Sequence, residues 1–173
     1  LKTEATPAAD QRPCEYGADG RWRETSSKSD IHSMACSSSA SPAALFTGST
    51  NVRVWSAERG VNTHVVQMRH HFSSVSCMHV AAAQHSATDL LAGGAASRET
   101  LWCGHTDGSV TAIDADGLHE CRTCFAAHRT AVSALAVVSS ELELWTGSDS
   151  GTIRAWPDLG RHQEHSVELA LPA

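Results

Sequence analysis

The cysteines and histidines are the residues of this chain whose types and spacing could do chemistry. Cys121 and Cys124 form a Cys-x-x-Cys pair flanked by His119 and His128, as in half of a zinc site. A structural zinc ion needs four ligands and often takes two such pairs, and the sequence holds no second Cys-x-x-Cys. Residues i and i+3 of a regular strand also point to opposite faces, so the two sulfurs should diverge. We therefore predict neither a metal site nor a cofactor.

A second candidate is the pair of Cys77 and His79, which share one face of a predicted strand. A cysteine beside a histidine can act as a nucleophile with its base, provided that a third group orients the base. The strand that carries this pair is expected to be the innermost and buried, and the sequence offers no third group. We therefore predict that the chain is not an enzyme.

Composition narrows the class of partner. The 173 residues carry a formal net charge of −6, which argues against nucleic acid or an anionic membrane as the main partner. The chain opens without a secretory segment, and its six cysteines show no disulfide framework. We expect free thiols and a cytoplasmic location. The longest apolar stretch, Ala131 to Val138, is too short to span a bilayer, and the first residue, Leu1, suggests a segment of something longer.

Three segments repeat one pattern, in which a short apolar strand and a glycine lead through a tight polar turn to a second strand. The glycines are Gly48, Gly104 and Gly147. Apolar runs before each segment and polar runs after two of them predict four strands per unit, the outermost being the most polar. The expected strands are 31–36, 44–47, 52–55 and 63–68, then 75–80, 100–103, 109–114 and 120–125, then 132–138, 142–146 and 152–156.

These strands divide the chain into parts. Residues 1–30 are expected to form a mobile, low-complexity leader, followed by repeats at 31–70, 71–127 and 128–160. Residues 161–173 are either the last strand of the third repeat or the start of a further one. An insertion from Ala81 to Glu99 contains Leu90 to Gly94, which imitates a second strand. We assign the second strand to residues 100–103 instead, because a tight turn and a third strand follow there.

The repeats resemble the WD-repeat family, which has a histidine before the inner strand, a glycine closing the second strand, an aspartate in the turn and a tryptophan ending the third strand. Asn51 and Ser150 stand in place of the aspartate, and Ile113 in place of the tryptophan, so no unit has the complete hydrogen-bonded set. The resemblance implies an all-β fold of three four-stranded antiparallel blades, part of a WD-repeat β-propeller. The matching positions are Gly48, Trp55, His71, Gly104, Asp107, His128, Gly147 and Trp156.

A narrower resemblance is to the amino-terminal propeller of plant-type inositol polyphosphate 5-phosphatases. In Glu143–Ser148 and Gly151–Pro157 a Leu-Trp-x-Gly strand leads to a Trp-Pro ending, and Gly104–Gly108 is similar to a turn of that group. The catalytic domain of such an enzyme would lie outside this chain, and none of its motifs occurs here.

The tryptophans Trp102 and Trp145 each precede a repeat glycine by two residues, so we expect both to be wedged between adjacent blades rather than to form an aromatic cage. Propeller rings have about 4–8 blades, but only three units are legible. Two apolar end faces should therefore be uncovered, and the chain alone should be marginally stable or self-associating.

The function expected from these features is a non-catalytic scaffold that binds a protein partner through the turns at one end of the blades. One alternative is the targeting or regulatory portion of an inositol polyphosphate 5-phosphatase. Another is a truncated product without independent activity. The candidate binding residues, placed at that end by the strand count, are Arg69, Thr106, Asp107, Arg129, Asp149 and Ser150.

Overall fold

The computed structural model describes residues 30–37, 44–66, 68, 73–82, 99–115, 118, 121–138, 143–157 and 167–170. Of the expected features, the leader before Asp30, the interior of the insertion, Arg69 and His71 lie outside these residues. No helix in the described ranges is both long and apolar enough to cross a membrane.

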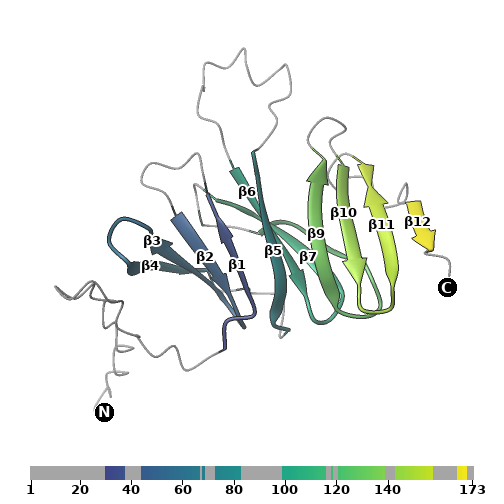
Figure 1. The fold of residues 1–173 in the computed structure, drawn as a ribbon, viewed down its shortest axis with the longest axis horizontal. Helices are drawn as coiled ribbons and strands as arrows, with labels where there is room; N and C mark the ends of the chain where they lie inside the picture. The colour runs from purple at the N-terminus through teal and green to yellow at the C-terminus, as the bar shows by residue number, and fades with distance from the viewer. Residues whose placement is uncertain are drawn as a thin grey trace, which may run out of the picture.

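Twelve strands in the described part form three separate four-stranded antiparallel sheets (Figure 1). Each sheet is a meander in which consecutive strands pair, so the predicted fold class is confirmed. The first sheet contains β1 (Ser33–Cys36), β2 (Ala44–Gly48), β3 (Val52–Ser56) and β4 (Val61–Val66). The second contains β5 (Val75–Ala82), β6 (Glu99–His105), β7 (Ser109–Asp114) and β8 (Cys121–Ala126). The third contains β9 (Val132–Val138), β10 (Glu143–Ser148), β11 (Thr152–Trp156) and β12 (Val167–Ala170).

The sequence left open whether residues 161–173 complete the third repeat or begin a further one, and β12 decides this. β12 pairs with β11 in antiparallel register, with Glu168 opposite Arg154 and Val167 opposite Ala155. It is therefore the outer strand of the third sheet, which extends past residue 160 to Ala170. In the second sheet, β6 takes the place next to β5, as expected for the second strand.

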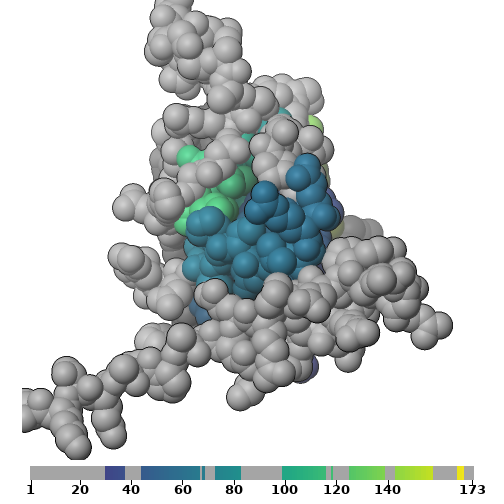
Figure 2. Space-filling model, turned by 90° about the vertical axis from the view of Figure 1, so that its left-hand side faces the viewer, coloured from purple at the N-terminus to yellow at the C-terminus, as the bar shows by residue number. Residues whose placement is uncertain are grey.

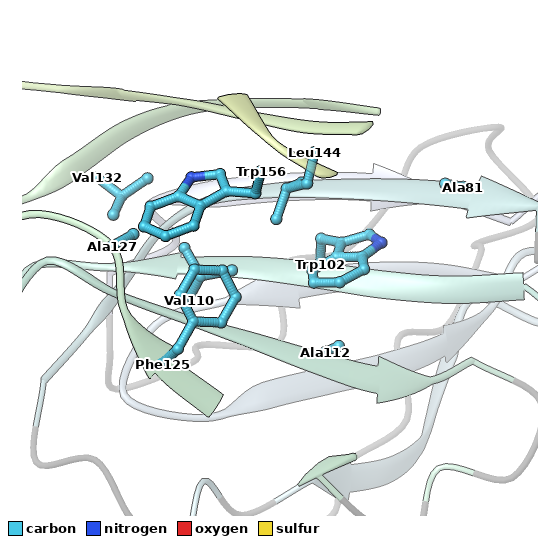
Figure 3. Close-up of a cluster of buried hydrophobic side chains, with 9 residues drawn as sticks. All are labelled: Ala81, Trp102, Val110, Ala112, Phe125, Ala127, Val132, Leu144 and Trp156. Carbon is cyan, nitrogen blue, oxygen red and sulfur yellow. The ribbon is translucent and has the colours of Figure 1, made fainter. Parts of the chain in front are cut away.

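Two hydrophobic clusters hold the three sheets face to face. The cluster between the first and second sheets joins Phe46 and Val54 to Val75 and Leu101. The cluster between the second and third sheets joins side chains of β5 to β11 (Figure 3): Ala81, Trp102, Val110, Ala112, Phe125, Ala127, Val132, Leu144 and Trp156. The second sheet is thus covered on both sides, which explains why its two central strands, β6 and β7, are almost continuously buried.

Alternation along the second strand of each sheet decides which neighbour each residue meets. Phe46 and Trp102 occupy equivalent places, two residues before the repeat glycine, and each packs toward the following sheet. Trp102 is only 3% exposed, so its predicted place between two blades is confirmed. The same prediction is wrong for Trp145, which is only partly buried. Leu144 packs against the second sheet, so Trp145 lies on the opposite face, where no further sheet follows among the described residues.

Candidate functional site: the turn rim

Tight turns and loops at one end of the sheets form a single structural unit, here called the rim. It comprises the turns at 49–51, 106–108 and 149–151 and the loops at 73–74 and 127–131. Backbone hydrogen bonds join these segments, both between the first and second sheets and between each turn and the loop that enters its own sheet. Val75 N donates to Ser49 O (2.7 Å), Thr106 N donates to Ser74 O (3.0 Å), and Asp149 N donates to Ala131 O (3.0 Å). The rim backbone is therefore fixed by the sheets that it connects.

The turn at Gly108 is the tightest joint of the rim. Its carbonyl oxygen accepts hydrogen bonds from the backbone N–H groups of Ala127 (3.0 Å) and His128 (2.9 Å), which lie in the loop that enters the third sheet. Gly108 has a φ of 86°, a conformation that side-chain-bearing residues adopt at a cost. A Cβ atom at this position would overlap the His128 carbonyl and lie 2.7 Å from Thr130 O. Only glycine lets the turn and the loop approach so closely.

Five of the six predicted binding residues lie in the described part of the rim, and all five are exposed: Thr106, Asp107, Arg129, Asp149 and Ser150. Some of their polar groups are engaged within the rim. Asp107 Oδ1 accepts hydrogen bonds from Ser109 N (2.9 Å) and Ser109 Oγ (2.6 Å). Thr106 Oγ1 accepts from Ser74 N (3.2 Å).

The charged side chains of Arg129 and Asp149 differ from their neighbours on the rim. Within the described residues, neither makes a hydrogen bond or a salt bridge through its side chain, and both are exposed. A partner would not have to break an internal contact to reach either charge. These two residues are therefore the groups on the rim most open to a new ion pair.

A polar network behind the rim supports the third sheet. Trp156 Nε1 donates to Thr146 Oγ1 (2.9 Å), and the same oxygen lies 2.7 Å from His128 Nε2. An indole N–H can only donate, so Thr146 Oγ1 accepts from Trp156, and its hydroxyl can donate to His128 Nε2 in the neutral tautomer that leaves this ring nitrogen unprotonated. Burial, with a further contribution from the Arg154 guanidinium, lowers the pKa of His128, which keeps the ring neutral as this arrangement requires.

The other two sheets keep part of this network or replace it. In the first sheet Trp55 Nε1 donates to Thr47 Oγ1 at 2.9 Å. In the second sheet Cys103 and Ile113 occupy the corresponding places, and both are fully buried. Replacing both members of a hydrogen-bonded pair with apolar groups leaves no unsatisfied partner, so this substitution is tolerated.

Arg154 is a residue whose role the sequence did not predict. Its Nη1 donates to Ala127 O (2.6 Å) in the loop from the second sheet. Nη2 and Nε donate to Glu168 Oε2 on β12, and the guanidinium lies 6.0 Å from the centre of the Trp156 ring. Arg154 thus ties the third sheet to the second. The signal was in the sequence, as an Arg–Glu pair, but the pairing of β12 was needed to see it.

The Cys77 and His79 pair has the opposite properties to a catalytic dyad. Burial raises the pKa of Cys77 to about 11 and lowers the pKa of His79. The thiol therefore stays protonated and the imidazole stays neutral near pH 7, whereas a nucleophilic cysteine needs a lowered pKa. Cys77 Sγ lies 3.4 Å from Val132 O, at the contact between the second and third sheets. Its role is in packing.

The expectation that Cys121 and Cys124 point to opposite faces of a regular strand is wrong. The register of β7 and β8 shifts between Ala112 and Ile113, so β8 is not a regular strand and simple alternation does not apply to residues 121 and 124. The side chains of these cysteines lie outside what the structure describes. Among the described residues, no group of three or more His, Cys, Asp or Glu side chains could hold a metal ion.

Three stacked antiparallel sheets, each with a repeat glycine before its tight turn, define part of a WD-repeat β-propeller. The chain belongs to the IP5P C-F beta-propeller family, whose model matches residues 22–170. Both resemblances noted from the sequence are confirmed. The matched range also includes residues 22–30, which we had assigned to the leader.

Solved structures with the same fold include the WD40 repeats of RRP9 and the protein U3-55K. The first is 20% identical with a TM-score of 0.63, and the match covers 84% of this chain and 40% of that chain. The second is 20% identical with a TM-score of 0.62, covering 84% and 41%. The chain therefore spans about two-fifths of the length of each of these two matched chains. No curated protein gives a significant sequence match.

Proposed function

We propose that this chain is a non-catalytic, cytoplasmic platform that binds a protein partner through the rim. The observation that carries the proposal is the exposure of Arg129 and Asp149 on backbone held by hydrogen bonds between turns and loops. A contact with preorganised groups costs less conformational entropy to form than a contact with a mobile segment. The free thiols of Cys36 and Cys77 are consistent with a reducing compartment.

The proposal predicts that reversing the two rim charges weakens partner binding. The double variant Arg129→Glu/Asp149→Lys should lose about tenfold or more in affinity for a partner captured with the wild-type chain, because complementary charges become like charges. Its folding should be unaffected, since both side chains lack partners in the described structure. Affinity is measured by titration calorimetry and folding by circular dichroism.

A matched control is available at the other end of the first sheet. Glu58 and Arg59 are exposed in the turn between β3 and β4, which antiparallel pairing puts at the end opposite the rim. Glu58→Lys/Arg59→Glu changes the same two charge types and should leave affinity within about twofold. Deletion of residues 83–97, within the insertion, should also preserve binding. Loss of binding on deletion, with no effect of the rim reversal, would put the interface on the insertion.

A second candidate function follows from the family match. The chain would then be the targeting or regulatory propeller of an inositol polyphosphate 5-phosphatase whose catalytic domain is encoded elsewhere in the same gene. The full-length transcript tests this directly. A phosphatase domain in the same reading frame supports it, and further repeats alone favour the scaffold.

A further inference from the structure

The exposed large hydrophobic side chains in the described part of the chain all belong to the two outer sheets. They are Ile31, Met34, Val65, Val138, Val167 and Leu169. In the first sheet, Met34 and Val65 share with Thr47 the face turned away from the second sheet. Figure 2 shows part of the first sheet (blue) at the surface of the molecule.

The outer face of the third sheet carries three of the exposed hydrophobic side chains, Val138, Val167 and Leu169. Leu169 lies opposite Ile153, Val167 opposite Ala155, and Val138 opposite Glu143. These residues alternate with Leu144 and Trp156, which pack onto the second sheet. The stack of three sheets thus has two apolar end faces, one on each side.

The two contacts inside the stack share one feature, in which a valine of the following sheet fills the space beside a repeat glycine. A Cβ atom on Gly48 would lie 2.8 Å from Val75 Cγ1, and one on Gly104 would lie 2.7 Å from Val132 Cγ1. Both distances are too short for a real side chain, so the next sheet requires a glycine at each place. Side chains of the same sheet also crowd the two positions, Ser33 Oγ at 2.9 Å from a Cβ atom on Gly48 and Cys77 Sγ at 2.6 Å from one on Gly104.

Each end face carries one of the two parts of this contact: the third sheet has the space beside a repeat glycine, and the first sheet has the side chain that could fill such a space. At Gly147, the third repeat glycine, Ala134 Cβ is the only atom of the described residues that an added Cβ would meet, at 3.5 Å. In each sheet the repeat glycine pairs with a residue of the first strand, and the position of interest lies two residues before that partner. Val75 and Val132 hold this position in the second and third sheets, and Ile31 holds it in the first. Ile31 is 50% exposed. The space beside Gly147 is therefore unoccupied by the described residues, and the Ile31 side chain that could fill it in a second copy is exposed.

The residues around Ile31 match the internal contacts as well. Met34 corresponds to Met78 and Leu135, which pack against the two clusters. Leu45 is only partly buried, whereas its counterparts Leu101 and Leu144, also three residues before a repeat glycine, are 0% exposed. The first sheet thus presents the same surface that the second and third sheets present to their predecessors.

We propose that the outer face of the first sheet in one copy of this chain docks on the outer face of the third sheet in a second copy, with Ile31 beside Gly147. The contact joins two different surfaces, so it is of the head-to-tail kind, which forms a ring when the rotation between copies closes. The described residues of each copy form three sheets, and two copies make six, within the range of about 4–8 blades found in propeller rings. This contact uses the outer faces of the first and third sheets, whereas the rim consists of turns and loops at one end of the strands.

The test is sedimentation velocity of the whole chain over a roughly hundredfold range of concentration. The wild type should associate into a species of two chains. Gly147→Ala should weaken this association at least tenfold, because a Cβ atom there would overlap Ile31 of the second copy, while the single chain has room for it. Ile31→Ser should weaken association by a similar factor, because it removes the side chain from the other half of the contact. Folding of both variants is followed by thermal unfolding at low concentration.

Mixing the two variants identifies the geometry. A Gly147→Ala chain keeps its Ile31 face, and an Ile31→Ser chain keeps its Gly147 face, so an equal mixture should form mixed pairs that neither variant forms alone. A wild type that remains monomeric, or one whose association neither substitution weakens, would overturn the proposal. So would association lost with Gly147→Ala but kept with Ile31→Ser, because the third sheets would then be pairing with each other.

Discussion

Replacing Gly108 with alanine should destabilise the chain much more than the same replacement at Gly151, although both glycines end a tight turn of the rim. Their φ angles are similar, 86° and 79°, and the left-handed conformation alone costs an alanine about 1–2 kcal/mol. That cost applies to both sites. At Gly151 no atom of the described residues lies within 4 Å of the added Cβ atom, so no further loss is expected there.

At Gly108 the added atom would overlap backbone that cannot move independently. The His128 carbonyl and Thr130 O belong to the loop that enters the third sheet. Relieving the overlap would separate turn and loop, and would break the hydrogen bonds that Gly108 O accepts from Ala127 and His128. We expect a total loss of roughly 3 kcal/mol or more for Gly108→Ala. Urea unfolding of the two variants measures the difference, and equal losses would mean that the rim is not packed as described.

Truncating Trp102 to alanine should also have a large effect, and Trp145→Ala provides the matched control. The two tryptophans hold equivalent places, but Trp102 is 3% exposed and packs with Leu144 across the contact between sheets. Removing a buried aromatic side chain typically costs 3–5 kcal/mol. No hydrogen bond is lost, because Trp102 Nε1 has no partner among the described residues. The loss therefore measures packing between the second and third sheets.

The loss for Trp145→Ala should be about 1 kcal/mol or less at low protein concentration, because this side chain lies on an open face. Its Nε1 donates to Glu143 Oε2 at 2.9 Å, a contact near the surface. Both free energies of unfolding come from urea titrations read by far-ultraviolet circular dichroism. If the two variants lost equal stability, a further sheet would have to cover Trp145 in solution.

Much of the fold could be predicted because the repeats check one another. The strands at Ser109–Asp114, Val132–Val138 and Thr152–Trp156 were predicted to the residue. For Ser109–Asp114 and Thr152–Trp156 a glycine, a turn and a large apolar residue recur at the same offsets, so an error in one unit would conflict with the other. The polar β4 was predicted two residues too late, since a mostly exposed strand has no apolar pattern to fix its ends.

The remaining differences depend on contacts that no local pattern encodes. The environment of Trp145 depends on whether another sheet follows, and the partners of Arg154 depend on β12 joining β11. The irregular register opposite Cys121 arises from the pairing of β7 and β8. For the rim, counting strands was sufficient to bring Thr106, Asp107, Arg129, Asp149 and Ser150 to one end. The sequence could not distinguish Asp107, which is bonded within its turn, from Asp149, which is not.

Hydrogen–deuterium exchange of the chain with and without its captured partner tests most directly whether a partner protein binds the rim. Exchange of the peptides covering residues 105–109, 127–131 and 148–152 should slow on binding, while those covering the β3–β4 turn at 57–60 should be unchanged. This pattern requires no substitution and reports on all described turns at once. Slower exchange confined to residues 57–60 or to the insertion, with the rim peptides unchanged, would contradict binding at the rim.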